Sequence, residues 1–150
     1  MTSAETTSAD IVILGGGSGG YACALRASQL GLSVILIESD KLGGPCLHRG
    51  CIPTKALLHA AEVADAARDS AHFGVKASLE GIDMPAVNSY RDGVVGRLYK
   101  GLQGLVKSRN VTFVAGYGRL TSPTTVEVDG TTYTGRHIVL ATGSYARSLP

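Results

Sequence analysis

The chain has 150 residues with 14 basic and 12 acidic side chains, so its formal charge is only +2 at pH 7. This balance, together with six Tyr, two Phe and no Trp, argues against a nucleic-acid-binding protein, which needs a basic patch and aromatic side chains that stack on bases. Apolar residues make up 44% of the chain and charged residues 17%. These values exclude disorder as the main state and predict one domain with a hydrophobic core.

The ends and the cysteine content predict a cytoplasmic protein without a membrane anchor. Three cysteines are too few for a disulfide scaffold. Residues 1–9 are polar and are expected to form a disordered tail, with no apolar segment typical of a secretory signal. No run of 18 apolar residues exists that could span a membrane. In a reducing cytoplasm, closely spaced cysteines are more often catalytic or metal-binding than structural.

The first forty residues follow the pattern of a βαβ unit. The apolar run 11–14 predicts a strand buried on both faces, and it leads into a glycine-rich turn. An Ala-rich helix is predicted from about Ser18 to Leu30, with Gly31 as its left-handed C-cap. A second buried strand is predicted at 34–37, ending at Glu38.

The glycine turn matches the fingerprint G-x-G-x-x-G at Gly15, Gly17 and Gly20. Its position between a strand and a helix, and the acid Glu38 at the end of the next strand, favour a dinucleotide site. Gly15 would allow the tight turn, Gly17 would let the backbone approach a pyrophosphate, and Gly20 would let helix and strand pack closely. Glu38 would accept ribose hydroxyls and disfavour a 2′-phosphate. A glycine-rich turn without a ligand, beside a surface Glu, is the alternative.

The rest of the chain alternates between helical and strand patterns. We expect a loop at 39–50, a helix at 51–68, a connection at 70–84 and a helix from Pro85 to about Arg109 that four glycines interrupt. Strands are predicted at 111–115, at 125–128 and 131–133 around an Asp-Gly turn, and at 137–141. The sequence therefore predicts an α/β fold with a mostly parallel sheet and a small antiparallel hairpin.

Cys46 and Cys51 form a C-x4-C motif whose surroundings favour redox chemistry. Pro53 places Cys51 in the first turn of the predicted helix, where the helix dipole favours a thiolate. Lys55 lies four residues on, on the same helix face, and adds positive charge. A reactive thiol next to a partner cysteine is what dithiol–disulfide exchange needs.

Two other interpretations of this motif remain open. One is a zinc site formed by Cys46, His48, Cys51 and His59, although the spacing is irregular and no C-x-x-C motif accompanies it. The other is a pair of unrelated buried cysteines. Cys23, inside the Ala-rich helix, is expected to be a small core residue.

Taken together, the glycine turn, Glu38, residues 43–55 and the segment Ala141-Thr142-Gly143 resemble the pyridine nucleotide–disulfide oxidoreductases. The residues from Ile52 to Glu62 most resemble the dihydrolipoamide dehydrogenase branch of that family. The resemblance implies a Rossmann-like FAD-binding domain, of which residues 10–150 would be the first segment. The NAD-binding and dimerisation domains would lie outside this chain, so we expect a fragment without full turnover.

The resemblance also implies roles for individual residues. Cys46 would be the interchange thiol, Cys51 the thiol against the flavin that forms the charge-transfer thiolate, and Lys55 a residue near the reactive edge of the flavin. The implied FAD contacts are Gly15, Gly17, Gly20, Glu38, Gly44, Cys46, Lys55, Gly118, Thr142, Gly143 and Ser144, and no metal ligand is implied. Two departures from the family pattern are Pro45 and His48, where Thr and Asn are common.

The cofactors and partners implied are those of the family. FAD would be bound, and NAD would be a substrate of the full-length enzyme. The partners would be dihydrolipoyl groups of a 2-oxoacid dehydrogenase complex and a second copy of the chain. The alternatives are another flavin disulfide reductase, of the mycothiol, glutathione or mercuric type, or a stand-alone nucleotide-binding redox sensor.

Overall fold

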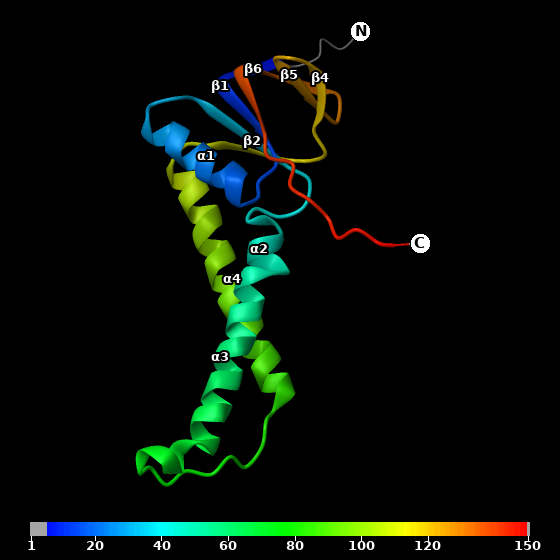
Figure 1. Cartoon of the computed structure of the whole chain (residues 1–150). Coiled ribbons are helices and arrows are strands. Elements are labelled where there is room, and N and C mark those ends of the chain that lie inside the picture. Colours follow the sequence, from blue (N-terminus) through cyan, green and yellow to red (C-terminus); the bar gives the residue numbers. More distant parts are fainter. Residues whose placement is uncertain (1–5, 150) are drawn as a thin grey trace. The chain divides into compact units, whose positions relative to one another are not determined.

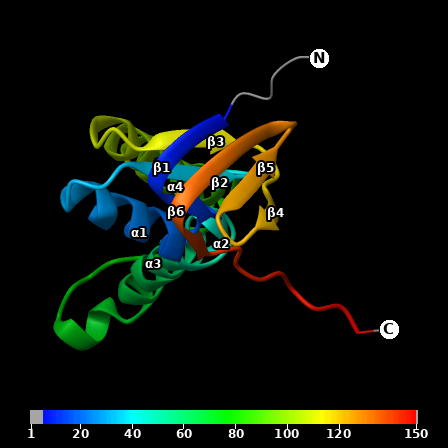
Figure 2. The ribbon, with the colours of Figure 1, turned by 90° about the horizontal axis from the view of Figure 1, so that it is seen from above.

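A six-stranded sheet organises the chain in the computed structural model, which describes residues 6–149. Its strands are β1 (Thr6–Leu14), β2 (Val34–Glu38), β3 (Thr112–Ala115), β4 (Arg119–Ser122), β5 (Thr125–Val128) and β6 (Thr131–Leu140). Their order is β3-β2-β1-β6-β5-β4 (Figures 1 and 2). Strands β3, β2, β1 and β6 are parallel to one another, whereas β5 pairs antiparallel with both β6 and β4. The predicted α/β fold with a mostly parallel sheet is therefore confirmed.

The apolar runs of β1 and β2 form the core of the sheet. Val12, Ile13, Leu36 and Ile37 are fully buried, because a parallel strand in the middle of a sheet is covered on both faces. Helix α1 (Ser18–Gln29) connects the two strands and packs against both. It buries its small residues Ala24 and Ala27 and, as predicted, is followed by a left-handed glycine, Gly31.

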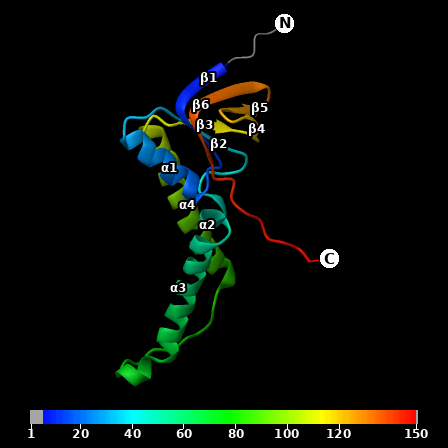
Figure 3. The ribbon, with the colours of Figure 1, turned by 45° about the horizontal axis from the view of Figure 1, so that its top comes forward.

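The chain divides into two units. The sheet unit comprises the residues up to Gly44 and those from Lys100 onward, and the helical unit comprises Pro45–Tyr99. The helical unit holds most of the short helix α2 (Gly44–His48), helix α3 (Cys51–Arg68), the 3-10 turn η1 (Ser70–Phe73) and the first part of α4 (Met84–Ser108). Within it, the start of α4 runs back alongside α3 (Figures 1 and 3).

Helices α3 and α4 begin where the sequence predicts. Helix α3 starts at Cys51, and α4 starts at Met84, one residue before the predicted Pro85. The carboxylate of Asp83 accepts a hydrogen bond from the Ala86 N–H at 3.0 Å and so caps the first turn of α4. The glycines inside α4 do not break it.

Three sequence-based expectations differ from the structure, and one strand was not expected. The predicted tail at 1–9 is wrong for Thr6–Ala9, which pair with β6 as part of β1, whereas residues 1–5 lie outside the described part. The predicted loop at 39–50 contains helix α2, whose first turn accommodates Pro45 because a helix start leaves its N–H groups unpaired. The strands predicted at 131–133 and 137–141 are one strand, β6. Strand β4 was not predicted.

Strand β6 is long because it has partners on both sides. Its first four residues pair antiparallel with β5, and residues 132–140 pair parallel with β1. These long-range pairings hold residues 134–136 in the sheet, although their sequence does not read as a strand. Among the residues that the structure describes, no helix is both long and apolar enough to cross a bilayer.

Candidate functional site

The carboxyl ends of β1, β2 and β6 meet at one edge of the sheet. The Gly15 N–H donates to the Ile37 carbonyl at 2.8 Å, and the Ala141 N–H donates to the Leu14 carbonyl at 2.8 Å. The chain leaves β1 for a neighbour on one side, β2, and later returns to the other side at β6. In α/β sheets such a position, beyond the carboxyl ends of the strands, is where nucleotides bind.

The structure explains the three glycines of the fingerprint in different ways. Gly15 has φ +108°, and a Cβ there would collide with the Ala141 carbonyl. A Cβ on Gly20 would collide with the Gly15 carbonyl, so this glycine permits the close approach of α1 to the turn. A Cβ on Gly17, in contrast, would meet only the Cα of Gly44, at 3.9 Å. Packing therefore requires Gly15 and Gly20, but it leaves Gly17 with open space in front of the helix.

Glu38 holds the glycine turn in place. Its Oε2 accepts a hydrogen bond from the Gly16 N–H at 2.7 Å, and its Oε1 accepts one from the Asp40 N–H at 2.8 Å. The sequence indicated only ribose hydroxyls as partners of this carboxylate. The Ser39 hydroxyl also donates to Oε1, at 3.4 Å, so Oε2 is the oxygen that keeps a lone pair for a hydrogen bond from a ligand.

The loop after β2 packs on the glycine turn. The Gly43 N–H donates to the Gly16 carbonyl at 2.9 Å, and a Cβ on Gly44 would lie 2.8 Å from the Cα of Gly17. The predicted site residue Gly44 is therefore next to the turn. Gly16 and Gly43 belong to the same cluster, but they were not among the site residues expected from the sequence. Both lie in runs of glycines, and these runs were the available signal.

The remaining predicted site residues of the sheet unit are Gly118 and the three residues 142–144. Thr142, Gly143 and Ser144 directly follow β6 and are exposed. A Cβ on Gly118 would collide with the Leu14 side chain and lie 3.0 Å from that of Val126. Gly118 thus has a packing role, and its predicted contact with FAD remains a prediction.

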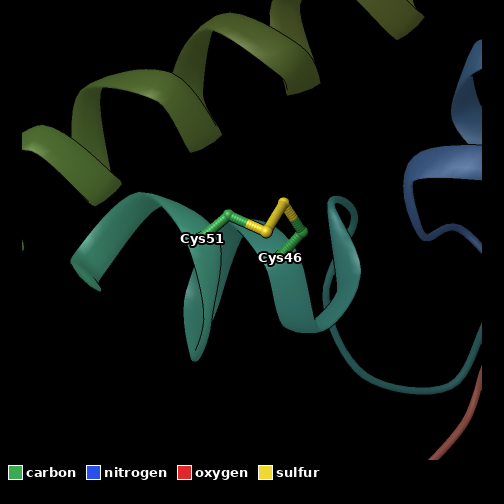
Figure 4. Close-up of a disulfide and its surroundings, with 2 residues drawn as sticks. All are labelled: Cys46 and Cys51. Carbon is green, nitrogen blue, oxygen red and sulfur yellow. A yellow bond between two sulfur atoms is a disulfide. The ribbon is translucent and has the colours of Figure 1, made fainter. Parts of the chain in front are cut away.

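In the helical unit, Cys46 and Cys51 form a disulfide (Figure 4). Their Cα atoms are 4.7 Å apart, within the range that a disulfide can bridge. Cys46 comes from α2 and Cys51 is the first residue of α3, as Pro53 predicted. The pairing overturns the interpretation as two unrelated cysteines, and we call this disulfide the redox pair.

The surroundings of the redox pair do not favour the zinc interpretation. The described residues contain no cluster of three or more His, Cys, Asp or Glu side chains that could hold a metal ion. His59 instead lies 3.3 Å from the carboxylate of Glu62. His48, between the two cysteines, is half-buried and contacts the ring of Tyr99 edge-on, with 4.9 Å between ring centroids. Nothing in the sequence indicated Tyr99.

Lys55 on α3 and Cys23 on α1 both keep contact with solvent. Lys55 is exposed on α3, one turn after Cys51. Cys23, expected in the core, is half-buried on α1 and is a free thiol. The free thiol therefore belongs to the sheet unit, whereas the redox pair belongs to the helical unit.

The fold and the site define a class of protein. A family model described as pyridine nucleotide-disulphide oxidoreductase matches residues 9–150, and the chain belongs to this family. The similar proteins include a mitochondrial dihydrolipoyl dehydrogenase of Arabidopsis thaliana, 47% identical over 94% of the chain. A dihydrolipoyl dehydrogenase of Thermus scotoductus is 44% identical over 90% of the chain. A leghemoglobin reductase of Vigna unguiculata is 45% identical over 94% of the chain.

The match covers only part of each relative. The chain spans 29% of the Arabidopsis and Thermus proteins and 28% of the Vigna protein. The similarity therefore concerns less than a third of each of these relatives.

Proposed function

We propose that the chain is the FAD-binding, disulfide-bearing part of a dihydrolipoyl dehydrogenase. The observation that carries this proposal is the Cys46–Cys51 disulfide at the start of α3, in a chain of this family. The 150 residues would be one part of a longer polypeptide, because the relatives are more than three times as long.

The redox pair would accept two electrons from a dihydrolipoyl group. One substrate thiolate attacks a sulfur of the pair, which breaks the Cys46–Cys51 bond and forms a mixed disulfide. The second substrate thiol then attacks the mixed disulfide, so that the lipoyl disulfide forms and the second cysteine is released. The substrate loses two electrons and two protons, and the two cysteines gain them as thiols.

The helix start at Cys51 would favour this chemistry. The unpaired N–H groups at the first turn of α3 place partial positive charge beside the sulfur, which stabilises a thiolate. Lys55 adds a positive charge one turn further on. We assign the interchange role to Cys46 and the role nearer the flavin to Cys51.

The residues at the sheet edge fit FAD. Gly17 leaves a cradle in front of α1 that a Cβ would begin to fill, and the N–H groups at that helix start suit phosphate oxygens. Glu38 would bind the ribose, and Gly15, Gly20, Gly44, Gly118 and 142–144 would line the rest, with Cys46 and Lys55 toward the flavin. Bound FAD would supply the two-electron acceptor that restores the disulfide, with NAD as the final oxidant.

We also propose the setting of the complete protein. It would act as a homodimer in a cytoplasm, and its substrate would be the dihydrolipoyl groups of a 2-oxoacid dehydrogenase complex. Its relatives carry the names of mitochondrial and bacterial dihydrolipoyl dehydrogenases, which supports this substrate class.

The test uses the complete polypeptide with FAD bound. It should reduce NAD with dihydrolipoamide as the electron donor. Replacing Cys46 or Cys51 by Ser should abolish this activity without loss of FAD, whereas replacing Cys23 by Ser is the matched control and should leave it unchanged. Full activity in the absence of the redox pair would contradict the proposal.

A further inference from the structure

One face of α4 is turned toward the segment that carries the redox pair. A small cavity between them is lined by His48 and Arg49 on the side of this segment and by Arg91 and Val95 on the side of α4. Arg91, Val95 and Tyr99 recur every four residues along α4, so they share one face of the helix. Tyr99 therefore lies on the face of α4 that is turned toward the redox pair, and all of these residues belong to the helical unit.

Tyr99 contacts this segment at His48. The two rings meet edge-on, with 4.9 Å between their centroids and 77° between their planes. This is one of the two arrangements that aromatic pairs prefer. Both side chains are half-buried. We call the residues from Cys46 to Cys51 the redox segment and its contact with Tyr99 the ring clamp.

The ring clamp joins the redox segment to a distant part of the chain. The backbone bonds of the segment are local, since the Arg49 N–H donates to the Pro45 carbonyl at 2.8 Å and the Thr54 N–H donates to the Gly50 carbonyl at 3.0 Å. These bonds shape the turn from α2 into α3. His48, the last residue of α2, stands in the middle of the segment, so a contact at this point restrains both of its ends.

We propose that Tyr99 is a positioning residue, which acts through His48 to stabilise the Cys46–Cys51 disulfide relative to the dithiol. The disulfide already fixes both ends of the redox segment, so ordering His48 against Tyr99 costs little further backbone entropy. In the dithiol the same ordering restricts a freer segment. The ring clamp is therefore stronger in the oxidised form, and by linkage it favours disulfide formation by the same factor. The inference rests on the proposed function, since it concerns the redox pair of that same reaction.

The strength of one ring contact limits the size of the effect. An aromatic pair of this kind can change an equilibrium constant by about two- to tenfold. Loss of the ring clamp should therefore lower the equilibrium constant for disulfide formation by about two- to tenfold. The reduction potential of the redox pair should rise accordingly, by up to about 30 mV for this two-electron couple.

The test measures the redox equilibrium of the pair in the complete polypeptide with FAD bound. The protein is equilibrated with mixtures of reduced and oxidised dithiothreitol. When the pair is oxidised, its two electrons and two protons pass to oxidised dithiothreitol, whose S–S bond breaks as the Cys46–Cys51 bond forms. Acid quenching, thiol alkylation and mass spectrometry then give the fraction of the pair in the dithiol form at each mixture.

Two single variants and their combination test the contact itself. Tyr99→Leu and His48→Asn should each make the pair easier to reduce, by about two- to tenfold in the equilibrium constant. The double variant should show no larger shift than either single variant, because the ring clamp needs both rings. A shift in only one of the single variants would overturn the inference, as would no shift in both.

Two controls separate positioning from a general loss of structure. Tyr99→Phe keeps the ring and should retain the wild-type equilibrium. Tyr90→Leu removes an aromatic side chain of the same helix that lines a different cavity, and it should leave the equilibrium unchanged. A shift in either control as large as that of Tyr99→Leu would overturn the inference. If the wild-type protein does not oxidise dihydrolipoamide, the proposed function fails instead, whereas the equilibrium with dithiothreitol still tests the ring clamp.

Discussion

Replacing Gly17 by Ala should separate the ligand-binding role of the glycine turn from its folding role. Gly17 is the N-cap of α1, with φ −69° and ψ −172°, a backbone conformation that any residue adopts. A methyl group there would meet only the Cα of Gly44 at 3.9 Å, an ordinary van der Waals contact. The folded apoprotein therefore has room for the added methyl group.

The expected effect on stability is small. Alanine reduces the entropy of the unfolded chain relative to glycine, but it is a poorer N-cap residue. These effects oppose each other, so the free energy of unfolding should change by less than about 1 kcal/mol.

The expected effect on FAD binding is large. The methyl group occupies the space where a pyrophosphate would approach the first N–H groups of α1. Losing one hydrogen bond to a charged phosphate oxygen costs about 1.5–3 kcal/mol, which is about a 10- to 140-fold increase in Kd. The assay is a fluorescence titration of the apoprotein of the complete polypeptide with FAD, together with its thermal melting by circular dichroism.

Two further glycine variants serve as controls. Gly101→Ala, in α4, adds a methyl group with no atom within 4 Å and should leave FAD affinity unchanged. Gly20→Ala places a Cβ against the Gly15 carbonyl, so the apoprotein itself should melt at a lower temperature. The assignment of a phosphate cradle to Gly17 is refuted if Gly17→Ala binds FAD as tightly as the wild type.

Three other outcomes are expected. Glu38→Ala removes the carboxylate that accepts the Gly16 N–H at 2.7 Å, so the apoprotein should lose about 1.5 kcal/mol of unfolding free energy, and Glu38→Gln should lose less; equal denaturation midpoints would contradict this. The hydroxyl and N–H of Ser33 lower the pKa of Asp10, so its stabilising contribution is present above about pH 4 and is lost as the pH falls further. The melting temperature of Asp10→Asn should accordingly fall less than that of the wild type as the pH is lowered below about 4. An equal fall in both proteins would contradict this prediction. Thiol titration of the denatured, unreduced chain should find one thiol, Cys23, and three after reduction.

The βαβ unit and its glycine turn could be predicted because their signals are local. The apolar runs of β1 and β2, the Ala-rich α1 and the left-handed Gly31 each depend on neighbours within a few residues. The start of α3 at Cys51 is equally local, because proline fits the first turn of a helix. The fold class followed from these signals, whereas the pairing of the two cysteines was one of three interpretations until the structure showed the disulfide.

The elements that were missed depend on distant partners. Strand β4 has a burial pattern that is mostly exposed, and it exists because β5 offers a strand to pair with. The residues that join the two halves of β6 are held by β1, more than 120 positions away in the chain. The network from Glu38 through Gly16 to Gly43 likewise joins segments that meet only when β2 lies beside β1.

The sequence by itself therefore determined the family and the α/β class, since each rests on short motifs with their own conformational preferences. Tertiary structure alone decided that Glu38 also holds the turn, that the Gly43 N–H binds the Gly16 carbonyl, and that Thr6–Ala9 extend β1 beside β6. The physical reason is that close approach, burial and charge pairing are properties of residues far apart in the chain, and they arise only when the chain is folded.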